Sequence, residues 1–200
     1  MIRRHFALLC SVFLLGINPC ATISLASTVS EPANSPTVAS ALSADKTATR
    51  NNAASLLYQL VQDEKNASLL LLVKGNRPEV NSLVNAISAT AGEATKNLLA
   101  LAKADPSLNL HATDLPSGEV AVRAAITKIK THQLLLSTGD NFEFALLLTQ
   151  TDALSYGYNL AQTALDNSTD SGQQQIFSAL RDAMKTQYQQ VIAFIRTPAK

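Results

Sequence analysis

The sequence predicts an all-α fold: an up-down four-helix bundle with a short, broken third helix and a long crossing connection. Two observations carry this prediction. Apolar residues recur at alternating gaps of four and three over residues 80–101, which is the spacing of one seam of a packed helix. Apolar and polar residues nowhere alternate for long enough to indicate a β-strand. The members of the seam are Val80, Val84, Ile87, Ala91, Ala94, Leu98 and Leu101.

The first 26 residues have the pattern of a secretory signal peptide. Arg3 and Arg4 precede an apolar run over residues 6–17, and small residues lead to a cleavage site after Ala26. The run is shorter than the ~20 residues that span a bilayer, which favours export over an uncleaved anchor. Both cysteines, Cys10 and Cys20, lie inside this segment. The mature chain is therefore expected to contain no disulfide and no cysteine metal site.

The charge balance disfavours a polyanionic partner. Removing Arg3 and Arg4 from the 16 basic residues leaves 14 against 15 acidic ones, a net charge of −1. Nucleic-acid binding calls for a clustered basic face, and Lys128 with Lys130 is ordinary helix surface. We expect no nucleic-acid partner and no membrane span after signal cleavage.

Residues 27–45 are predicted to be a flexible tether, because they contain almost no large apolar side chain. Residues 46–200 are predicted to form the helical bundle domain. The expected helices cover residues 47–74, 78–103, 119–137, 141–166 and 172–195. Three capping boxes, at residues 76–79, 140–143 and 171–174, mark helix starts. The connection over residues 105–118 carries Leu108, Leu110 and Leu115 and is expected to lie across the side of the bundle.

Polar residues interrupt the predicted core lines. Glu64, Gln150 and Gln187 each fall on a line of otherwise apolar residues in a different helix. One interpretation places Glu64 at the solvated edge of its seam. The other is that the three side chains form a hydrogen-bonded polar layer in the core, which fixes the register of the helices.

Three leucine-rich tracts are apolar on all sides of their helices, at residues 68–73, 134–136 and 146–148. Each tract is either covered by the rest of the bundle or forms an exposed patch for a partner. Together they favour self-association or an envelope protein partner.

Two stretches carry a resemblance to a known family. They are the run from Glu64 to Val80 with the helix that follows it, and the string at residues 137–143, Ser-Thr-Gly-Asp-Asn-Phe-Glu. These resemble the secreted, ferritin-like four-helix proteins of domain of unknown function 4142, which are often labelled putative outer membrane proteins. The similarity extends over about residues 53–195 and implies a ferritin-like bundle.

The resemblance implies an interior metal site, but the histidines that would complete it are missing. Glu64 and Glu143 match the carboxylates of the family's pattern. The other ligand positions fall on Thr90, Ala91, Leu154 and the neighbourhood of Thr186. Two carboxylates alone do not hold a transition metal. His111 and His132 match no ligand position and are expected at the surface.

The sequence contains none of the common motifs of hydrolases, phosphate-binding loops or zinc proteases. We therefore expect a non-enzymatic, exported bundle with no cofactor and no metal, which acts by binding or has a structural role in the periplasm or cell envelope. The alternative is an envelope metal-binding or oxidative-stress protein that uses Glu64 and Glu143. In a third hypothesis, a pocket lined by Ala91, Leu154 and their neighbours holds an apolar ligand, although we expect that space to be filled.

Overall fold

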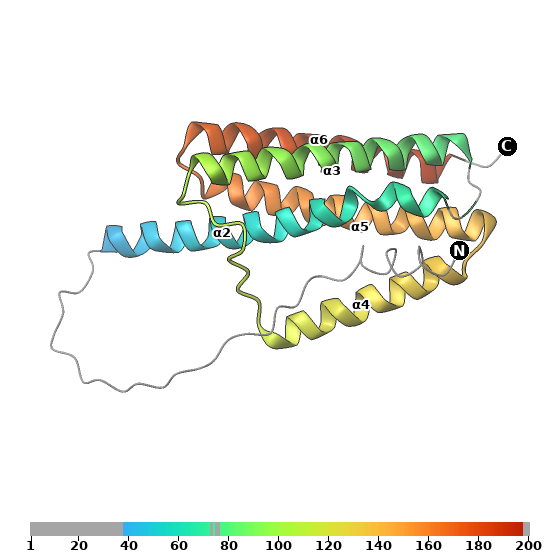
Figure 1. The fold of residues 1–200 in the computed structure, drawn as a ribbon, viewed down its shortest axis with the longest axis horizontal. Coiled ribbons are helices and arrows are strands. Elements are labelled where there is room, and N and C mark those ends of the chain that lie inside the picture. The colour runs from blue at the N-terminus through green and yellow to red at the C-terminus, as the bar shows by residue number, and fades with distance from the viewer. Residues whose placement is uncertain (1–37, 73, 75–76, 198–200) are drawn as a thin grey trace.

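The computed structural model describes residues 38–72, 74 and 77–197, and all regular structure in this part of the chain is helical (Figure 1). The predicted signal peptide, the first part of the predicted tether and Asn76 lie outside the described residues. The elements are α2 (Val38–Glu64), the 3-10 helix η2 (Ala67–Leu72), α3 (Pro78–Ala104), α4 (Ser117–Leu136), α5 (Gly139–Asp166) and α6 (Ser171–Arg196). None of the described helices is both long and apolar enough to span a membrane.

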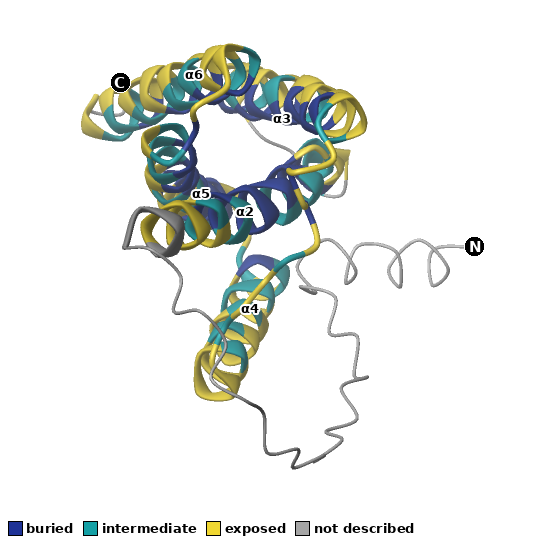
Figure 2. Ribbon diagram, turned by 90° about the vertical axis from the view of Figure 1, so that its left-hand side faces the viewer, coloured by how far each residue is buried: buried dark blue, intermediate teal, exposed yellow. Residues whose placement is uncertain are grey.

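Four of the helices form a bundle, and α4 projects from it. Figure 2 shows α2, α3, α5 and α6 surrounding a common axis, with their buried faces turned inward. Helices α2 and α6 each pack against both α3 and α5. In contrast, α4 rests on α5 near one end, and its other end stands away from the bundle. Leu134 is the one fully buried residue of α4 among those described.

The seam predicted for residues 80–101 is confirmed. All seven of its members are buried in α3. The predicted line of α5 is also buried, including Gln150 and Gly157. In α6 the deepest side chains are Gln173, Phe177 and Val191. Phe177 and Met184 are buried where the apolar pattern predicts the preceding residues, Ile176 and Ala183, which are only partly buried.

The first helix differs from the prediction at both ends. It begins at Val38 rather than Thr47, so that residues 38–45 of the predicted tether are helical. It ends at Glu64 rather than Lys74, and the chain continues as η2. Ser88 of α3 makes this change possible: its hydroxyl donates to the carbonyl of Glu64 and accepts from the amide of Ser68, both at 3.0 Å. Backbone groups released at the helix end are thereby satisfied.

All three predicted capping boxes are wrong in detail. The N-cap of α3 is Arg77 rather than Asn76, and it makes no side-chain capping bond. Helix α5 begins at Gly139, which has a φ of +54°, and its N-cap Thr138 makes no side-chain capping bond. Glu143 cannot complete a box with Asp140, because its carboxylate accepts hydrogen bonds from Arg77 instead. In α6 the N-cap is Asp170 rather than Ser171, and its carboxylate accepts from the amide of Gln173 at 2.8 Å.

The long connection lies against α2, as expected. Leu108 and Leu110 are buried. Arg50 donates to the carbonyl of Ser107 at 2.7 Å, and the Ser55 hydroxyl donates to that of Asn109 at 2.9 Å. These bonds to backbone carbonyls fix the path of a segment that has no helix of its own.

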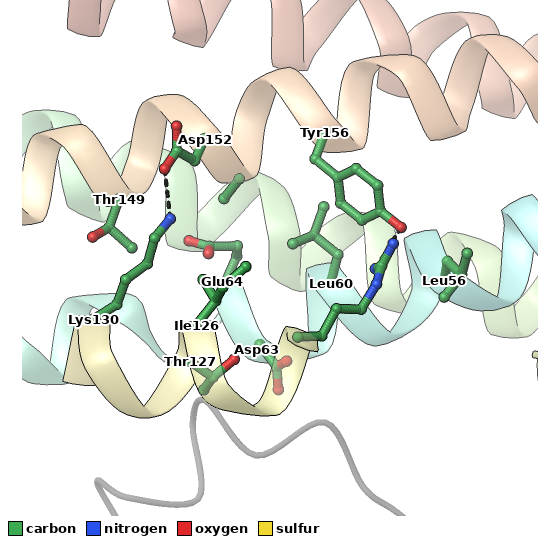
Figure 3. A pocket seen from close by; sticks show the side chains of 12 residues that line it. Leu56, Leu60, Asp63, Glu64, Ile126, Thr127, Lys130, Thr149, Asp152 and Tyr156 are labelled. Carbon is green, nitrogen blue, oxygen red and sulfur yellow. Dashed lines mark hydrogen bonds and ion pairs between the residues drawn. The ribbon is translucent and has the colours of Figure 1, made fainter. Parts of the chain in front are cut away.

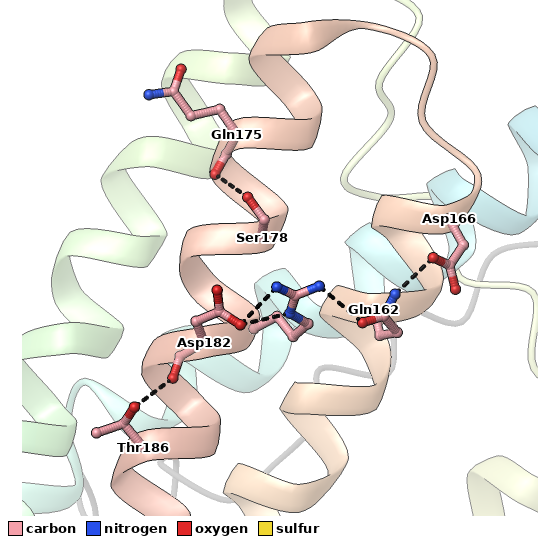
Figure 4. A network of polar contacts seen from close by, with 7 residues as sticks. Gln162, Asp166, Gln175, Ser178, Asp182 and Thr186 are labelled. Atoms are coloured by element: carbon pink, nitrogen blue, oxygen red, sulfur yellow. Dashed lines mark hydrogen bonds and ion pairs between the residues drawn. The ribbon is translucent and has the colours of Figure 1, made fainter.

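The pair α5 and α6 carries an exposed polar network (Figure 4). Arg181 of α6 forms an ion pair with Asp182 at 2.8 Å and donates to Gln162 of α5 at 3.2 Å. Gln162 donates in turn to Asp166. Exposed pairs of this kind contribute little free energy. We attribute the association of α5 with α6 to the buried side chains beneath them.

Gly157 and Gly92 provide a matched test of core packing. A Cβ at Gly157 would lie 2.5 Å from Met184 Sδ and 2.8 Å from Leu60 Cδ2, whereas a Cβ at Gly92 meets nothing within 4 Å. We expect Gly157→Ala to lower the free energy of unfolding by about 1–3 kcal/mol through overpacking. We expect Gly92→Ala to raise it by about 0.5–1 kcal/mol, because alanine favours a helix. Urea unfolding measures both, and equal effects of the two substitutions would contradict this description of the core.

Candidate functional site

A pocket opens where the projecting helix α4 leaves the bundle. It has a volume of about 240 Å³ and lies between α2, α4 and α5 (Figure 3). Its walls are apolar side chains interspersed with five charged ones. The lining residues are Leu56, Leu60, Asp63, Glu64, Arg123, Ile126, Thr127, Lys130, Thr149, Asp152, Ala153 and Tyr156.

Glu64 is the most unusual group in this wall. The residue is 7% exposed, and its Oε2 atom has no hydrogen-bond partner in the described part of the chain. The pKa of its carboxyl is raised to about 7: burial is the main cause and Asp63 adds to it, while Gln150 and Lys130 oppose the rise. A substantial fraction of this carboxyl is therefore protonated at neutral pH.

Asp63 is the second carboxyl in the pocket, from the adjacent position of α2. Burial raises its pKa to about 7 as well, and Lys65 partly opposes the effect. Figure 3 shows Asp63 and Glu64 between the helices, with Lys130 and Asp152 to one side and Tyr156 to the other. Two adjacent carboxyl groups thus share an environment that disfavours their charged forms.

The cationic side chains of the pocket are engaged by other groups. Lys130 of α4 forms an ion pair with Asp152 of α5 at 2.5 Å. Arg123 forms an ion pair with Glu119 and donates to the Tyr156 hydroxyl, both at 2.7 Å. These contacts join α4 to α5 across the pocket mouth and leave the carboxyls of α2 without a salt-bridge partner among the described residues.

The C-terminal end of α4 is held by Lys74. Its ammonium group donates to the carbonyl oxygens of Leu134, Leu135 and Ser137 and lies 4.8 Å from the centre of the Phe142 ring. The last carbonyls of a helix have no partner within the helix and carry partial negative charge. A lysine there anchors the end of α4 to the segment between α2 and α3.

The structure brings together two members of the predicted polar layer. Glu64 and Gln150 lie next to each other, close enough for Gln150 to lower the pKa of the Glu64 carboxyl. Yet neither amide atom of Gln150 forms a hydrogen bond of ordinary geometry with a described residue, so we treat this as a contact only. The third member, Gln187, instead donates to Thr90 Oγ1 at 2.7 Å and to the carbonyl of Ala86.

Glu143, the other predicted carboxylate, lies at a different place in the fold. It is 3% exposed and accepts from the amide and Nε of Arg77, each at 2.5 Å. This hydrogen bonding raises the pKa of Arg77, whose guanidinium also lies 5.0 Å from the centre of the Phe194 ring. Glu143 does not line the pocket. The described residues contain no group of three or more His, Cys, Asp or Glu side chains arranged to hold a metal ion.

Two of the matched metal-ligand positions are buried apolar residues, whereas Thr90 is half-buried and accepts from Gln187 and Thr186 is exposed. Ala91 and Leu154 are buried, and Met184 and Leu60 fill the space beside Gly157. The histidines lie elsewhere: His132 is exposed, and exposed His111 makes an edge contact with the Tyr58 ring at 6.1 Å.

Sequence analysis missed an exposed apolar stripe on α4. Its members are Val122, Ile126, Ile129 and Leu136, which are 46–69% exposed. Their spacing of four, three and seven residues places them on one face, with Gln133 in the gap. This spacing resembles that of a buried seam, so the sequence alone does not show that the face is uncovered. Every predicted leucine tract leaves part of itself exposed: Leu69 and Leu72 in the first, Leu136 in the second and Leu148 in the third.

Comparisons with known proteins add no relative from which a function could be transferred. No family model, no curated protein and no solved structure matches this chain. The function must therefore be argued from the pocket and the stripe on α4.

The ion pair of Glu143 allows a test of what holds α3 to α5. We expect Glu143→Gln to lower Tm by about 3–6 °C, because it removes the charge from a buried carboxylate that Arg77 contacts through two donors. The matched control is Glu93→Gln, which removes an exposed pair with Lys96. That change is expected to alter Tm by less than about 2 °C. Circular dichroism melts measure both, and indistinguishable shifts would contradict a structural role for Glu143.

Proposed function

We propose that this protein is an exported, non-enzymatic helical bundle of ferritin-like type that acts by binding in the cell envelope or periplasm. In this proposal its first partner is a second copy of the same chain. The exposed stripe on α4 is the observation that carries the proposal. The pattern of residues 1–26 supports export, and the square arrangement of α2, α3, α6 and α5 supports the bundle type.

The spacing of the stripe favours a helix as the occupant. Four apolar residues and Gln133 follow each other at gaps of four and three, as in the seam of α3 that packs inside the bundle. An identical α4 would present the same spacing over the same length. Gln133 supports this choice, because its amide can hydrogen-bond to its counterpart in a second copy but would lack a partner in lipid.

The expected association is weak. Each of the four side chains is already partly covered, so that burying the rest contributes roughly 1 kcal/mol per residue and roughly 8 kcal/mol over two copies. Association itself costs about 4–15 kcal/mol. A dimer through this stripe alone is therefore expected only at micromolar concentrations or above.

Sedimentation velocity at about 10–500 µM tests this proposal. We expect the weight-average sedimentation coefficient to rise with concentration, and Ile129→Glu and Leu136→Glu to abolish the rise. Leu99→Glu is the matched control, because Leu99 is 47% exposed on α3, away from the stripe. A protein that stays monomeric over the whole range, or a dimer that both α4 variants leave intact, would contradict self-association through α4.

A further inference from the structure

We propose that the pocket between α2, α4 and α5 is a binding site for a small organic cation, an alkylammonium group on a short apolar body. This goes beyond the proposed self-association: Ile126 belongs to both the stripe and the pocket, but Ile129 and Leu136 of the stripe do not line the pocket.

The size of the pocket suits a small molecule. Its volume of about 240 Å³ corresponds to the liquid volume of roughly eight water molecules. A chain of about six carbons with one amino group fills a comparable space. Ile126 and Asp152 of its lining are exposed to solvent, so a ligand can enter without the bundle opening.

The buried polar atom of the pocket lining that lacks a partner is a carboxyl oxygen, which is an acceptor when the group is ionised. Glu64 is more than nine-tenths buried, lines the pocket and has an oxygen without a hydrogen-bond partner among the described residues. Leaving such an acceptor unpaired costs free energy, which suggests that a donor is missing from the wall. Asp63 places a second carboxyl beside it.

When Asp63 and Glu64 are ionised, the pocket carries a net negative charge. Lys130 and Arg123 are neutralised by Asp152 and Glu119. An ammonium group therefore finds two carboxyls that have no salt-bridge partner among the described residues and that attract it when they are ionised. Anionic ligands would meet repulsion there, and a purely apolar ligand would leave the Glu64 oxygen unpaired.

The apolar wall supplies contacts for the body of the ligand. Leu56 and Leu60 of α2, Ile126 of α4 and Ala153 of α5 line the same cavity. A bare metal ion would make no use of these side chains, and the described carboxyls form no metal-binding group. The combination of an acidic floor and apolar walls favours an amphiphilic amine.

Binding is expected to depend on pH. The groups around Glu64 are Asp63 of α2, Lys65 directly after that helix, Lys130 and Arg123 from α4, and Asp152 and Tyr156 from α5. An alkylammonium ion keeps its charge up to about pH 10, whereas both carboxyls lose their protons near pH 7. The ionised form is the one that attracts the ligand. Affinity should therefore rise between pH 6 and pH 8.

Isothermal titration of the purified protein with n-hexylammonium chloride is the test. We expect saturable binding at pH 8 with a Kd of about 1 mM or tighter. We also expect at least tenfold weaker binding of hexan-1-ol and hexanoate, and a loss of at least tenfold in affinity for hexylammonium in Glu64→Gln. Asp63→Asn provides a second variant should the first fold poorly, as judged by circular dichroism. Asp45→Asn, at an exposed position of α2, is the matched control and should bind as the unmodified protein does.

Three results would overturn the proposal: no hexylammonium binding at ligand concentrations up to about 10 mM, hexan-1-ol binding as tightly as hexylammonium, or folded Glu64→Gln and Asp63→Asn variants that both retain full affinity. Leu136→Glu separates this proposal from self-association, because it removes part of the stripe and leaves the pocket lining unchanged. Hexylammonium should bind that variant undiminished.

Discussion

The carboxyl of Glu64, buried at the junction of α2, α4 and α5 without an opposing charge, is the constraint around which this end of the molecule is arranged. Helix α2, which carries Glu64, ends at that residue, and the Ser88 hydroxyl donates to its backbone carbonyl. Gln150 of α5 lies next to Glu64, and Lys130 forms its ion pair with Asp152 rather than with Glu64. A charged group in such a place is costly unless it is paired or protonated, and burial raises its pKa to about 7.

The four bundle helices form the core, and the projecting helix α4 carries the surfaces on which both proposals rest. Side chains of α2, α3, α5 and α6 close the core, with Met184 and Leu60 taking the space beside Gly157. Helix α4 adds one buried leucine and is held mainly by polar contacts at Lys74, Lys130 and Arg123. Because α4 contributes little to the core, its remaining apolar side chains are available for a partner. The gap beneath it is available for a ligand.

The sequence was informative where a pattern has a single physical reading. The seam of residues 80–101 predicted a buried face, since seven apolar residues follow one another at that spacing with no polar member among them. The sequence also points to Glu64, because a charged residue on an otherwise apolar line of a helix is costly to bury unless it is paired. The sequence could not show that Asp63 also lines a pocket, that Asp152 engages Lys130, or that α4 stands apart from the bundle. These depend on distances between helices, and a stripe has the same spacing whether it is covered or exposed.

The titration of Glu64 tests this account most directly. The ¹³C chemical shift of its side-chain carboxyl, assigned by its loss in Glu64→Gln, can be followed from pH 4 to pH 9 in the purified protein. The account predicts a midpoint near pH 7, because burial without a counter-charge favours the protonated form. A midpoint near the ordinary value of 4.5 would mean that the carboxyl is hydrated or paired. That result would contradict the uncompensated acidic floor on which the pocket depends.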